Sequence, residues 1–110
     1  MNIEERMAQL REIAGKFAKA YANREHLDEF KKSKLASLMN QAERDGFSTS
    51  AAQEREARAH PEYLSLLDGL RAAVEASELL RWELKIAEIG SEIWRTQQAN
   101  VRAERKGYGA

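Results

Sequence analysis

The stretch HPEYLSLLDGLRAAVEASELLRWELK, residues 60–85, decides the fold. It contains the only proline of the chain, Pro61, and Glu62 follows directly. A proline suits the first position of a helix, where its missing N–H would be unpaired anyway, and a carboxylate in the first turn suits the positive end of the helix dipole. The stretch therefore predicts a helix that begins at Pro61, with His60 close to the N-cap.

Apolar and small residues recur every three or four positions along this helix, which is the spacing of a packed helix face. The pattern predicts one uninterrupted helix to about Glu104, with a length of about 65 Å. Its main row consists of Tyr63, Leu66, Leu70, Ala73, Ser77, Leu80, Leu84, Ala87, Ser91, Trp94, Gln98 and Val101. Two further apolar rows, Leu79–Ile86–Ile93 and Trp82–Ile89, make the stripe wider than one partner helix covers.

The first part of the chain also has helical spacing. Asn2, with Glu5 three residues later, predicts a capped helix start. The apolar spacing then shifts its phase near residues 22 and 23, so either one helix runs to about Arg44 or the chain breaks at Asn23. We favour one helix, since neither glycine nor proline stands there; a break would instead give a compact bundle of three or four helices. The two apolar sets are Ile3, Met7, Leu10, Ala14, Phe17 and Tyr21, then Leu27, Phe30, Leu35, Leu38 and Ala42.

A turn separates the two helical arms at RDGFSTS, residues 44–50. Gly46 suits the C-cap of the first arm, and Ser50 with Gln53 predicts the N-cap of a new helix. The segment AAQEREARA, residues 51–59, has no large apolar side chain, so we expect it to be a connector on the surface.

These elements predict an all-α fold in which two long helices form an antiparallel hairpin, joined by a short helix. We expect one domain over residues 1–106 and a flexible tail over 107–110. The wide apolar stripe predicts assembly into an oligomeric helical bundle. Gly15, which costs up to about 1 kcal/mol against alanine in a helix, is expected to mark close packing of another helix. The residues predicted at the oligomer interface are Gly15, Leu79, Trp82, Ile86, Ile89 and Ile93.

Composition narrows the class of protein. The chain has no cysteine, which excludes disulfides and thiol chemistry and agrees with a reducing cytoplasm. The sequence contains no run of 18 apolar residues, so it predicts no membrane span. Its first residues include several acids and do not resemble a signal peptide. We therefore expect a cytoplasmic protein. The 18 basic and 18 acidic residues balance, although acids dominate 62–92 and basic residues dominate 95–106.

Catalytic and metal-binding patterns are weak in this sequence. His26 and Glu29 have the spacing of two metal ligands on one helix face, but a site needs further ligands with complementary spacing. The sequence has no glycine-rich phosphate loop and no Gly-x-Ser-x-Gly nucleophile motif. We therefore predict no enzyme, no cofactor, and no catalytic or metal-ligating residue.

Two basic segments are candidates for phosphate contact, FKKSK at 30–34 and RTQQANVRAERK at 95–106. Phe30, Trp94 and Tyr108 lie in or near them and have rings suited to base stacking. The alternative is that Phe30 and Trp94 belong to the core and that the last cations serve the helix dipole. The candidate nucleic-acid contacts are Lys31, Lys32, Lys34, Arg95, Arg102, Arg105 and Lys106.

Three segments carry a resemblance to a known group of proteins: REHLDEFKKSKLASLM, AAQEREARAHPEYLSLLDGLRAAVEASELLRWELK and EIWRTQQANVRAERKGY. They resemble small proteins of tailed phages and prophages whose genes lie near recombination and replication genes. The segment HPEYLSLLDGLRAAVEASELLRWELK is also similar in layout to UvsY-type recombination mediators, helical oligomers that load a recombinase on single-stranded DNA. The chain departs from those mediators in lacking a basic excess.

The resemblance implies a non-enzymatic helical accessory protein of phage DNA recombination or replication. Such a protein would be a homo-oligomer that holds protein partners and, in one version, single-stranded DNA. Two alternatives stay open at this point: a phage inhibitor of a host defence complex, and a purely structural helical oligomer.

Overall fold

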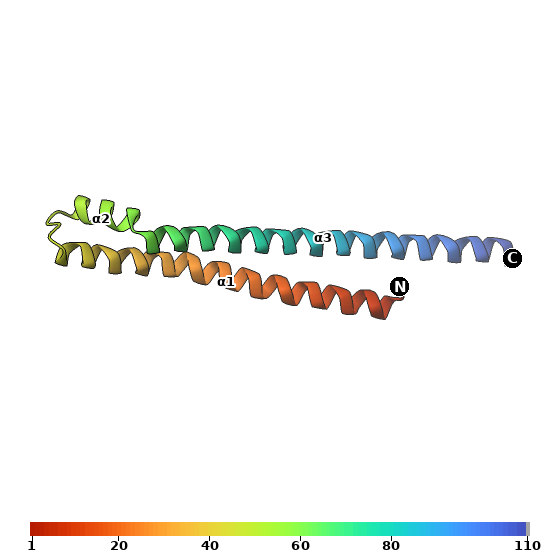
Figure 1. Cartoon of the computed structure of the whole chain (residues 1–110). Coiled ribbons are helices and arrows are strands. Elements are labelled where there is room, and N and C mark those ends of the chain that lie inside the picture. The colour runs from red at the N-terminus through yellow and green to blue at the C-terminus, as the bar shows by residue number, and fades with distance from the viewer. Residues whose placement is uncertain (110) are drawn as a thin grey trace. The chain divides into compact units, whose positions relative to one another are not determined.

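The computed structural model describes the backbone of residues 1–109 and the side chains of residues 1–107. The described chain forms three helices, α1 over Ile3–Arg44, α2 over Ser50–Ala59 and α3 over Pro61–Gly109 (Figure 1). Helices α1 and α3 pack antiparallel, and α2 is the short connector between them. The predicted all-α hairpin is therefore confirmed.

Helix α1 begins as its sequence predicts. The side-chain oxygen of Asn2 accepts a hydrogen bond from the backbone N–H of Glu5 at 2.8 Å, which satisfies one of the unpaired donors of the first turn. The helix then continues through Asn23 to Arg44. The prediction of one continuous helix is confirmed, and the alternative of a break at Asn23 is wrong.

The end of α1 is set by Gly46, which has a φ of 107°. The N–H of Gly46 donates to the carbonyl of Glu43 and the N–H of Phe47 donates to the carbonyl of Ala42, both at 3.1 Å. This pair of bonds is a Schellman motif, which satisfies the last carbonyls of a helix and needs a left-handed residue, usually glycine.

The start of α2 differs from the prediction by one residue. Thr49, not Ser50, is the N-cap, and its hydroxyl oxygen accepts a hydrogen bond from the N–H of Ala52 at 3.1 Å. Gln53 consequently lies one position beyond the capping-box place, and its side-chain amide donates to the carbonyl of Phe47 at 2.9 Å. Thr49 therefore caps α2, and Gln53 bonds to the preceding turn through its side chain.

His60 joins α2 to α3. Its N–H donates to the carbonyl of Ala57, ending α2, and its carbonyl accepts from Tyr63 and Leu64, starting α3. Its Nδ1 accepts from the N–H of Glu62 at 3.1 Å. Pro61 occupies the first position of α3, as predicted. The helix extends to Gly109, past the predicted end at Glu104, so most of the expected tail is helical and only Ala110 lies outside the described residues.

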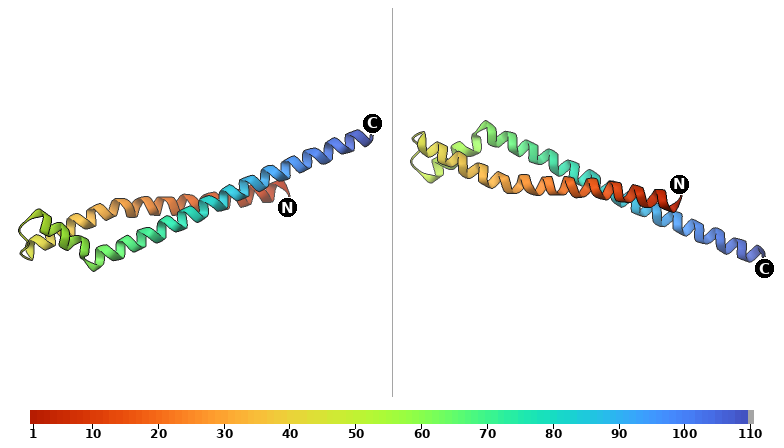
Figure 2. Two further views of the ribbon diagram at one scale, coloured as in Figure 1. Left: turned by 90° about the horizontal axis from the view of Figure 1, so that it is seen from above. Right: turned by 90° about the horizontal axis from the view of Figure 1, so that it is seen from below.

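Contacts divide the chain into two compact units. Unit 1 contains Met1–Phe17 and α3 from Leu79 onward, and unit 2 contains Ala18–Glu78. In unit 2, α2 lies beside the end of α1 and the start of α3 (Figure 2). That the chain forms a single domain stays a prediction.

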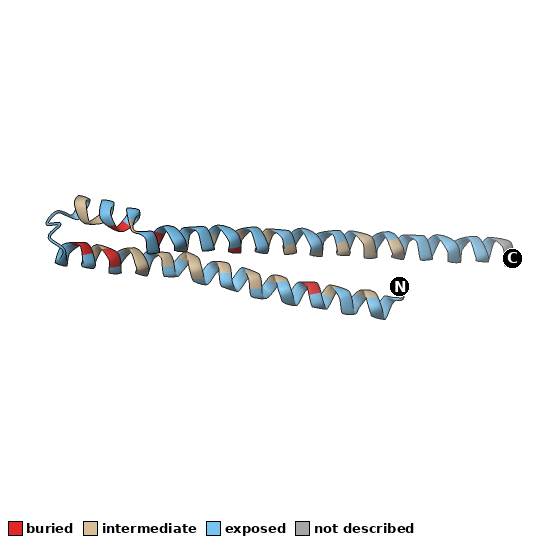
Figure 3. Cartoon of the chain, in the orientation of Figure 1, coloured by how far each residue is buried: buried red, intermediate tan, exposed pale blue. Residues whose placement is uncertain are grey.

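The core of unit 2 lies where its three helices meet (Figure 3). It consists of Leu38, Ala57 and Tyr63, with Leu35 and Met39 packed against them. Ala57 is 1 % exposed, so α2 is more than the surface connector that its polar sequence suggested. A small side chain is what lets this short helix approach the other two closely.

The packed row of α3 matches the sequence pattern. In unit 2 it includes Tyr63, Ala73 and Ser77, which are buried, and in unit 1 it continues half-buried to Trp94. Gln98 and Val101, the last members of the predicted row, are exposed. The row was therefore predicted correctly as far as Trp94.

The packed row of α1 differs from the prediction. The side chains that turn inward are Leu10, Ile13 and Phe17 in unit 1 and Ala20, Arg24 and Leu27 in unit 2. These residues keep a spacing of three or four without the predicted change of phase. The predicted change of phase had two causes. The charged residue Arg24 occupies a position in the packed row. In addition, the predicted row included four residues that are exposed, namely Ile3, Met7, Tyr21 and Phe30.

Arg24 is accommodated in this row by an ion pair within unit 2. Its Nη1 donates to Oε1 of Glu78 on α3 at 3.0 Å, and both side chains are partly buried. The long methylene stem of an arginine packs on apolar neighbours while the guanidinium reaches a carboxylate. A charged residue can therefore take a position that periodicity assigns to an apolar one.

Candidate interaction surfaces

An exposed apolar row runs along α3 within unit 1, and we call it the outer seam. It consists of Leu79, Trp82, Ile86, Ile89 and Ile93, with exposed fractions of 64, 61, 67, 47 and 54 %. The steps of three and four residues are those of a heptad pattern. The sequence had named all five residues as interface candidates, and the structure leaves all five exposed.

The outer seam faces away from the row that packs against α1. Each of its members stands two positions after a residue of the packed row, as Trp82 follows Leu80 and Ile86 follows Leu84. Two residues correspond to about 200° around a helix of 3.6 residues per turn. Helix α3 thus has two apolar faces on nearly opposite sides, and α1 covers one of them.

Apolar side chains of α1 are exposed in the same unit. Ile3 and Met7 are 48 and 41 % exposed and line a shallow groove with Leu10 of α1 and Ser91 of α3. Contiguous exposed apolar groups of this kind mark sites where proteins bind other proteins. Unit 1 therefore has exposed apolar side chains on α1 as well as on α3, and both are available to a binding partner.

Gly15 does not mark close packing between helices of one chain. It is exposed, and a Cβ atom built on it meets no other atom within 4 Å. Helix α3 of the same chain therefore does not pack closely against Gly15. A role for Gly15 in contact with a second copy stays a prediction.

The first basic segment is neutralised by acids within unit 2. Lys31 pairs with Asp28 at 3.3 Å and Lys32 pairs with Glu29 at 3.1 Å, both one turn away on α1. The hydrogen bond and charge of Glu29 raise the pKa of Lys32. These two lysines therefore present little free charge to a phosphate.

Lys34 makes the shortest ion pair, at 2.7 Å from Glu62 in the first turn of α3. The Lys34 ammonium donates a hydrogen bond to this carboxylate and, with its charge, lowers the pKa of Glu62. The pair joins α1 to α3 close to the unit 2 core. Lys34 is consequently engaged in a contact between α1 and α3 within unit 2, which gives a structural reason for a lysine at this position.

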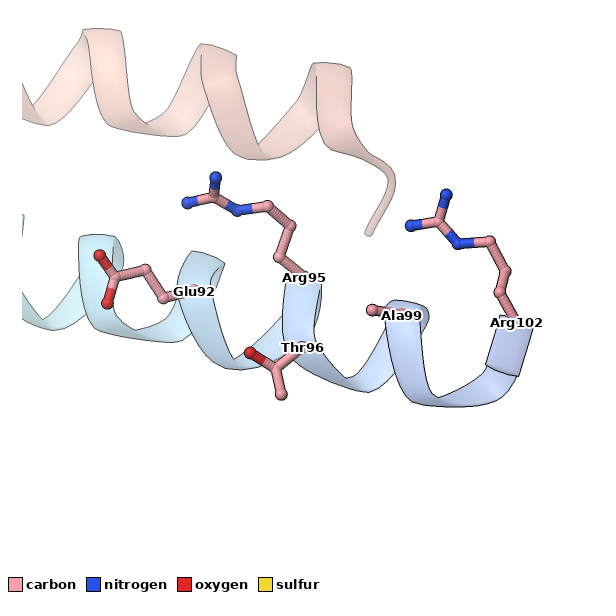
Figure 4. Close-up of a pocket in the computed structure, with 5 residues that line it drawn as sticks. All are labelled: Glu92, Arg95, Thr96, Ala99 and Arg102. Carbon is pink, nitrogen blue, oxygen red and sulfur yellow. The ribbon is translucent and has the colours of Figure 1, made fainter. Parts of the chain in front are cut away.

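The second basic segment is placed differently. Arg95 and Arg102 lie two turns apart on α3, and their guanidinium groups extend on the same side of the helix (Figure 4). Together with Thr96 and Ala99 they line an open hollow, with Glu92 at its edge. Arg105 and Lys106 are exposed one turn further along. Within the described side chains, these four cations have no ion pair, so their charge remains available to an anionic partner.

The aromatic candidates for base stacking have separate surroundings. Phe30 is 46 % exposed and stacks on His26, with ring centroids 6.2 Å apart. Trp94 is half-buried in unit 1 beneath the guanidinium of Arg6, 5.2 Å from its ring centroid. The core alternative is thus wrong for Phe30, whereas Trp94 belongs to the half-buried packed row of α3 and not to the buried core. The side chain of Tyr108 lies outside the described residues.

The described residues contain neither a metal-binding cluster nor a helix suited to cross a membrane. Among residues 1–109, no group of three or more histidine, cysteine, aspartate or glutamate side chains is arranged to hold a metal ion. His26 and Glu29, the pair with ligand spacing, instead contact Phe30 and Lys32. None of the three described helices combines the length and apolar character needed to cross a membrane.

The sequence did not reveal the ion pairs Arg24–Glu78 and Lys34–Glu62, which join α1 to α3 within unit 2. A signal existed for Arg24, since it stands at heptad spacing between Ala20 and Leu27 and Glu78 has the opposite charge.

Comparison of the chain with protein-family models, curated proteins and solved structures found no match. The surfaces of α3 that bear on function are the outer seam and the cations Arg95, Arg102, Arg105 and Lys106.

Proposed function

We propose that this protein is a non-enzymatic accessory of phage DNA recombination or replication that acts as an oligomeric helical scaffold. The observation that carries the proposal is the outer seam, because five large apolar side chains in heptad spacing favour a helical protein partner. The resemblance to phage proteins encoded near recombination genes supplies the biological setting.

A catalytic role has no support from the titratable groups. Glu29 raises the pKa of Lys32 and Lys34 lowers the pKa of Glu62, and each shift arises mainly from an ion pair on the surface. Functional acids and bases are instead recognised by burial and by several converging partners in a cleft. We therefore propose binding, without chemistry, as the activity.

Direct contact with single-stranded DNA is proposed for one segment only. Lys31, Lys32 and Lys34 are occupied by ion pairs. Arg95, Arg102, Arg105 and Lys106 remain as the candidates, and their placement along one helix end suits a short run of phosphates.

A gel-shift titration tests DNA contact with a matched control. The triple variant Arg102→Gln, Arg105→Gln, Lys106→Gln should weaken binding to single-stranded DNA and flatten its salt dependence, because fewer counterions are released. The control variant Lys31→Gln, Lys32→Gln, which leaves the Lys34–Glu62 pair intact, should bind like the unmodified protein. If the unmodified protein does not shift DNA at low salt, direct binding is wrong and only the protein-scaffold function survives.

Affinity capture from phage-infected cells with mass spectrometry tests the scaffold function. The unmodified chain is compared with the variant Trp82→Glu, Ile89→Glu, which places two charges on the outer seam. Specific loss of a recombinase or single-strand-binding protein from the variant supports the proposal. Capture of a host defence nuclease instead would favour the inhibitor function and contradict a role in recombination.

A further inference from the structure

We infer that the outer seam binds the same seam of a second copy of this chain in antiparallel orientation, with Ile86 of one copy opposite Ile89 of the other. The inference rests on the proposed homo-oligomer and defines its interface and register. It derives from three properties of α3: the length of the seam, the charges beside it, and the exposure of its side chains.

The length and spacing of the seam fit one partner helix. Leu79, Ile86 and Ile93 take the a positions of the heptad, and Trp82 and Ile89 take the d positions. In an antiparallel pair, a residues of one helix pack in layers with d residues of the other. The proposed register gives two Ile86–Ile89 layers at the centre and a Trp82–Ile93 layer on either side of them.

The charges beside the seam select this register. Lys85 and Glu92 occupy the positions directly before Ile86 and Ile93, where side chains of two antiparallel helices meet across the interface. With Ile86 opposite Ile89, Lys85 of each copy faces Glu92 of the other. A two-fold axis repeats every contact, so two ion pairs of opposite charge flank the apolar centre.

Other registers of the antiparallel pair are opposed by charge. A shift of one heptad in one direction places Lys85 opposite Lys85 of the second copy and leaves Ile93 facing Glu75. A shift in the other direction places Glu92 opposite Glu92. Like charges across a helix interface disfavour a pairing and so determine which partner geometry forms.

A parallel pair is also disfavoured. It would bring the two Trp82 rings into one layer, where the proposed pairing gives each ring an isoleucine. It would place Lys85 opposite Gly90 and Glu92 opposite Gln97, which leaves both charges without a partner across the interface. The antiparallel pair also brings the positive and negative ends of the two helix dipoles together.

The exposure of the seam agrees with a stable pair. Its five large side chains are 47–67 % exposed within unit 1. A stable interface has a buried apolar centre surrounded by a polar rim. The outer seam supplies such a centre, and Lys85 and Glu92 stand beside it as rim residues.

A distance measurement between two copies tests the orientation. The chain has no cysteine, so Glu104→Cys places one spin label on an exposed site of each full-length copy. In the proposed register residue 104 lies alongside residue 71 of the second copy, which puts the two labels about 50 Å apart. A parallel pair would put them within about 20 Å. A short distance would overturn the inference.

A charge exchange tests the register independently. Lys85→Glu alone and Glu92→Lys alone should each weaken self-association about tenfold, because each places two pairs of like charges across the interface. The double variant should restore most of the loss. Absence of this rescue, or a dimer that persists in Trp82→Glu, Ile89→Glu, would refute the inference while leaving another homo-oligomer possible. A monomer of the unmodified protein at high micromolar concentration would refute the homo-oligomer itself.

Discussion

Replacement of Ser77 by alanine is expected to stabilise the protein. Ser77 lies in the packed row of α3, its side chain is 0 % exposed, and its Oγ has no hydrogen-bond partner among the described residues. A buried hydroxyl without a partner costs about 1–3 kcal/mol. Serine also favours a helix interior less than alanine does, by about 0.5 kcal/mol. Ser77→Ala removes both costs.

One effect opposes this gain. The lost oxygen leaves a void of about 15 Å³, which costs about 0.4 kcal/mol if the neighbours do not move. The free energy of unfolding should therefore rise by about 1–3 kcal/mol in total. With a urea slope typical of small proteins, the midpoint should move up by about 1 M.

Urea unfolding followed by far-ultraviolet circular dichroism measures this change. All variants are compared at one protein concentration, because self-association adds to the apparent stability. Ser65→Ala is the matched control, since Ser65 is exposed on the same helix and its replacement changes helix propensity alone. If Ser77→Ala gains no more than Ser65→Ala, the buried hydroxyl carries no cost and the reasoning is wrong.

Three further predictions concern the turn, the first helix and pH. Gly46→Ala should lower the free energy of unfolding by about 1–2 kcal/mol in urea titrations, because alanine is strained at a φ of 107°. Gly15→Ala should raise it by up to about 1 kcal/mol, since the added Cβ meets no atom within 4 Å in the chain; a loss of mass in light scattering would support the predicted place of Gly15 at an oligomer interface. Because Lys34 lowers the pKa of Glu62, this carboxylate stabilises the fold above its unfolded pKa of about 4.3, and the effect is lost as pH falls through the lower folded value. Glu62→Gln should accordingly lose less stability than the unmodified protein between about pH 5 and pH 3; equal losses would contradict this link.

Features that depend on near neighbours in the sequence were predictable. The cap of α1 at Asn2, the stop at Gly46 and the start of α3 at Pro61 each arise from the chemistry of a few consecutive residues. The packed row of α3 to Trp94 and the exposed outer seam followed from periodicity, because a continuous helix fixes which side chains share a face.

The phase of the α1 row was not predictable from apolar spacing. Ile3, Met7 and Tyr21 are as apolar as Ile13, but the row turned toward α3 is the one that contains Arg24. That choice depends on Glu78, 54 positions away along the chain, which neutralises the arginine. A pattern of apolar spacing assigns every charged residue to the exposed face. It contains no information about a partner 54 positions away along the chain.

The sequence by itself therefore determined the number of helices, most of their ends and the two apolar faces of α3, because backbone geometry and capping act over a few residues. Only the tertiary structure decided that Lys34 pairs with Glu62 and that Ala57 enters a core. It likewise distinguished the lysines of α1 that lie beside acids from the cations near the end of α3, which have no ion pair among the described side chains. A charge is free or neutralised according to what folding brings within a few ångströms of it, and that distance is a property of the packed chain.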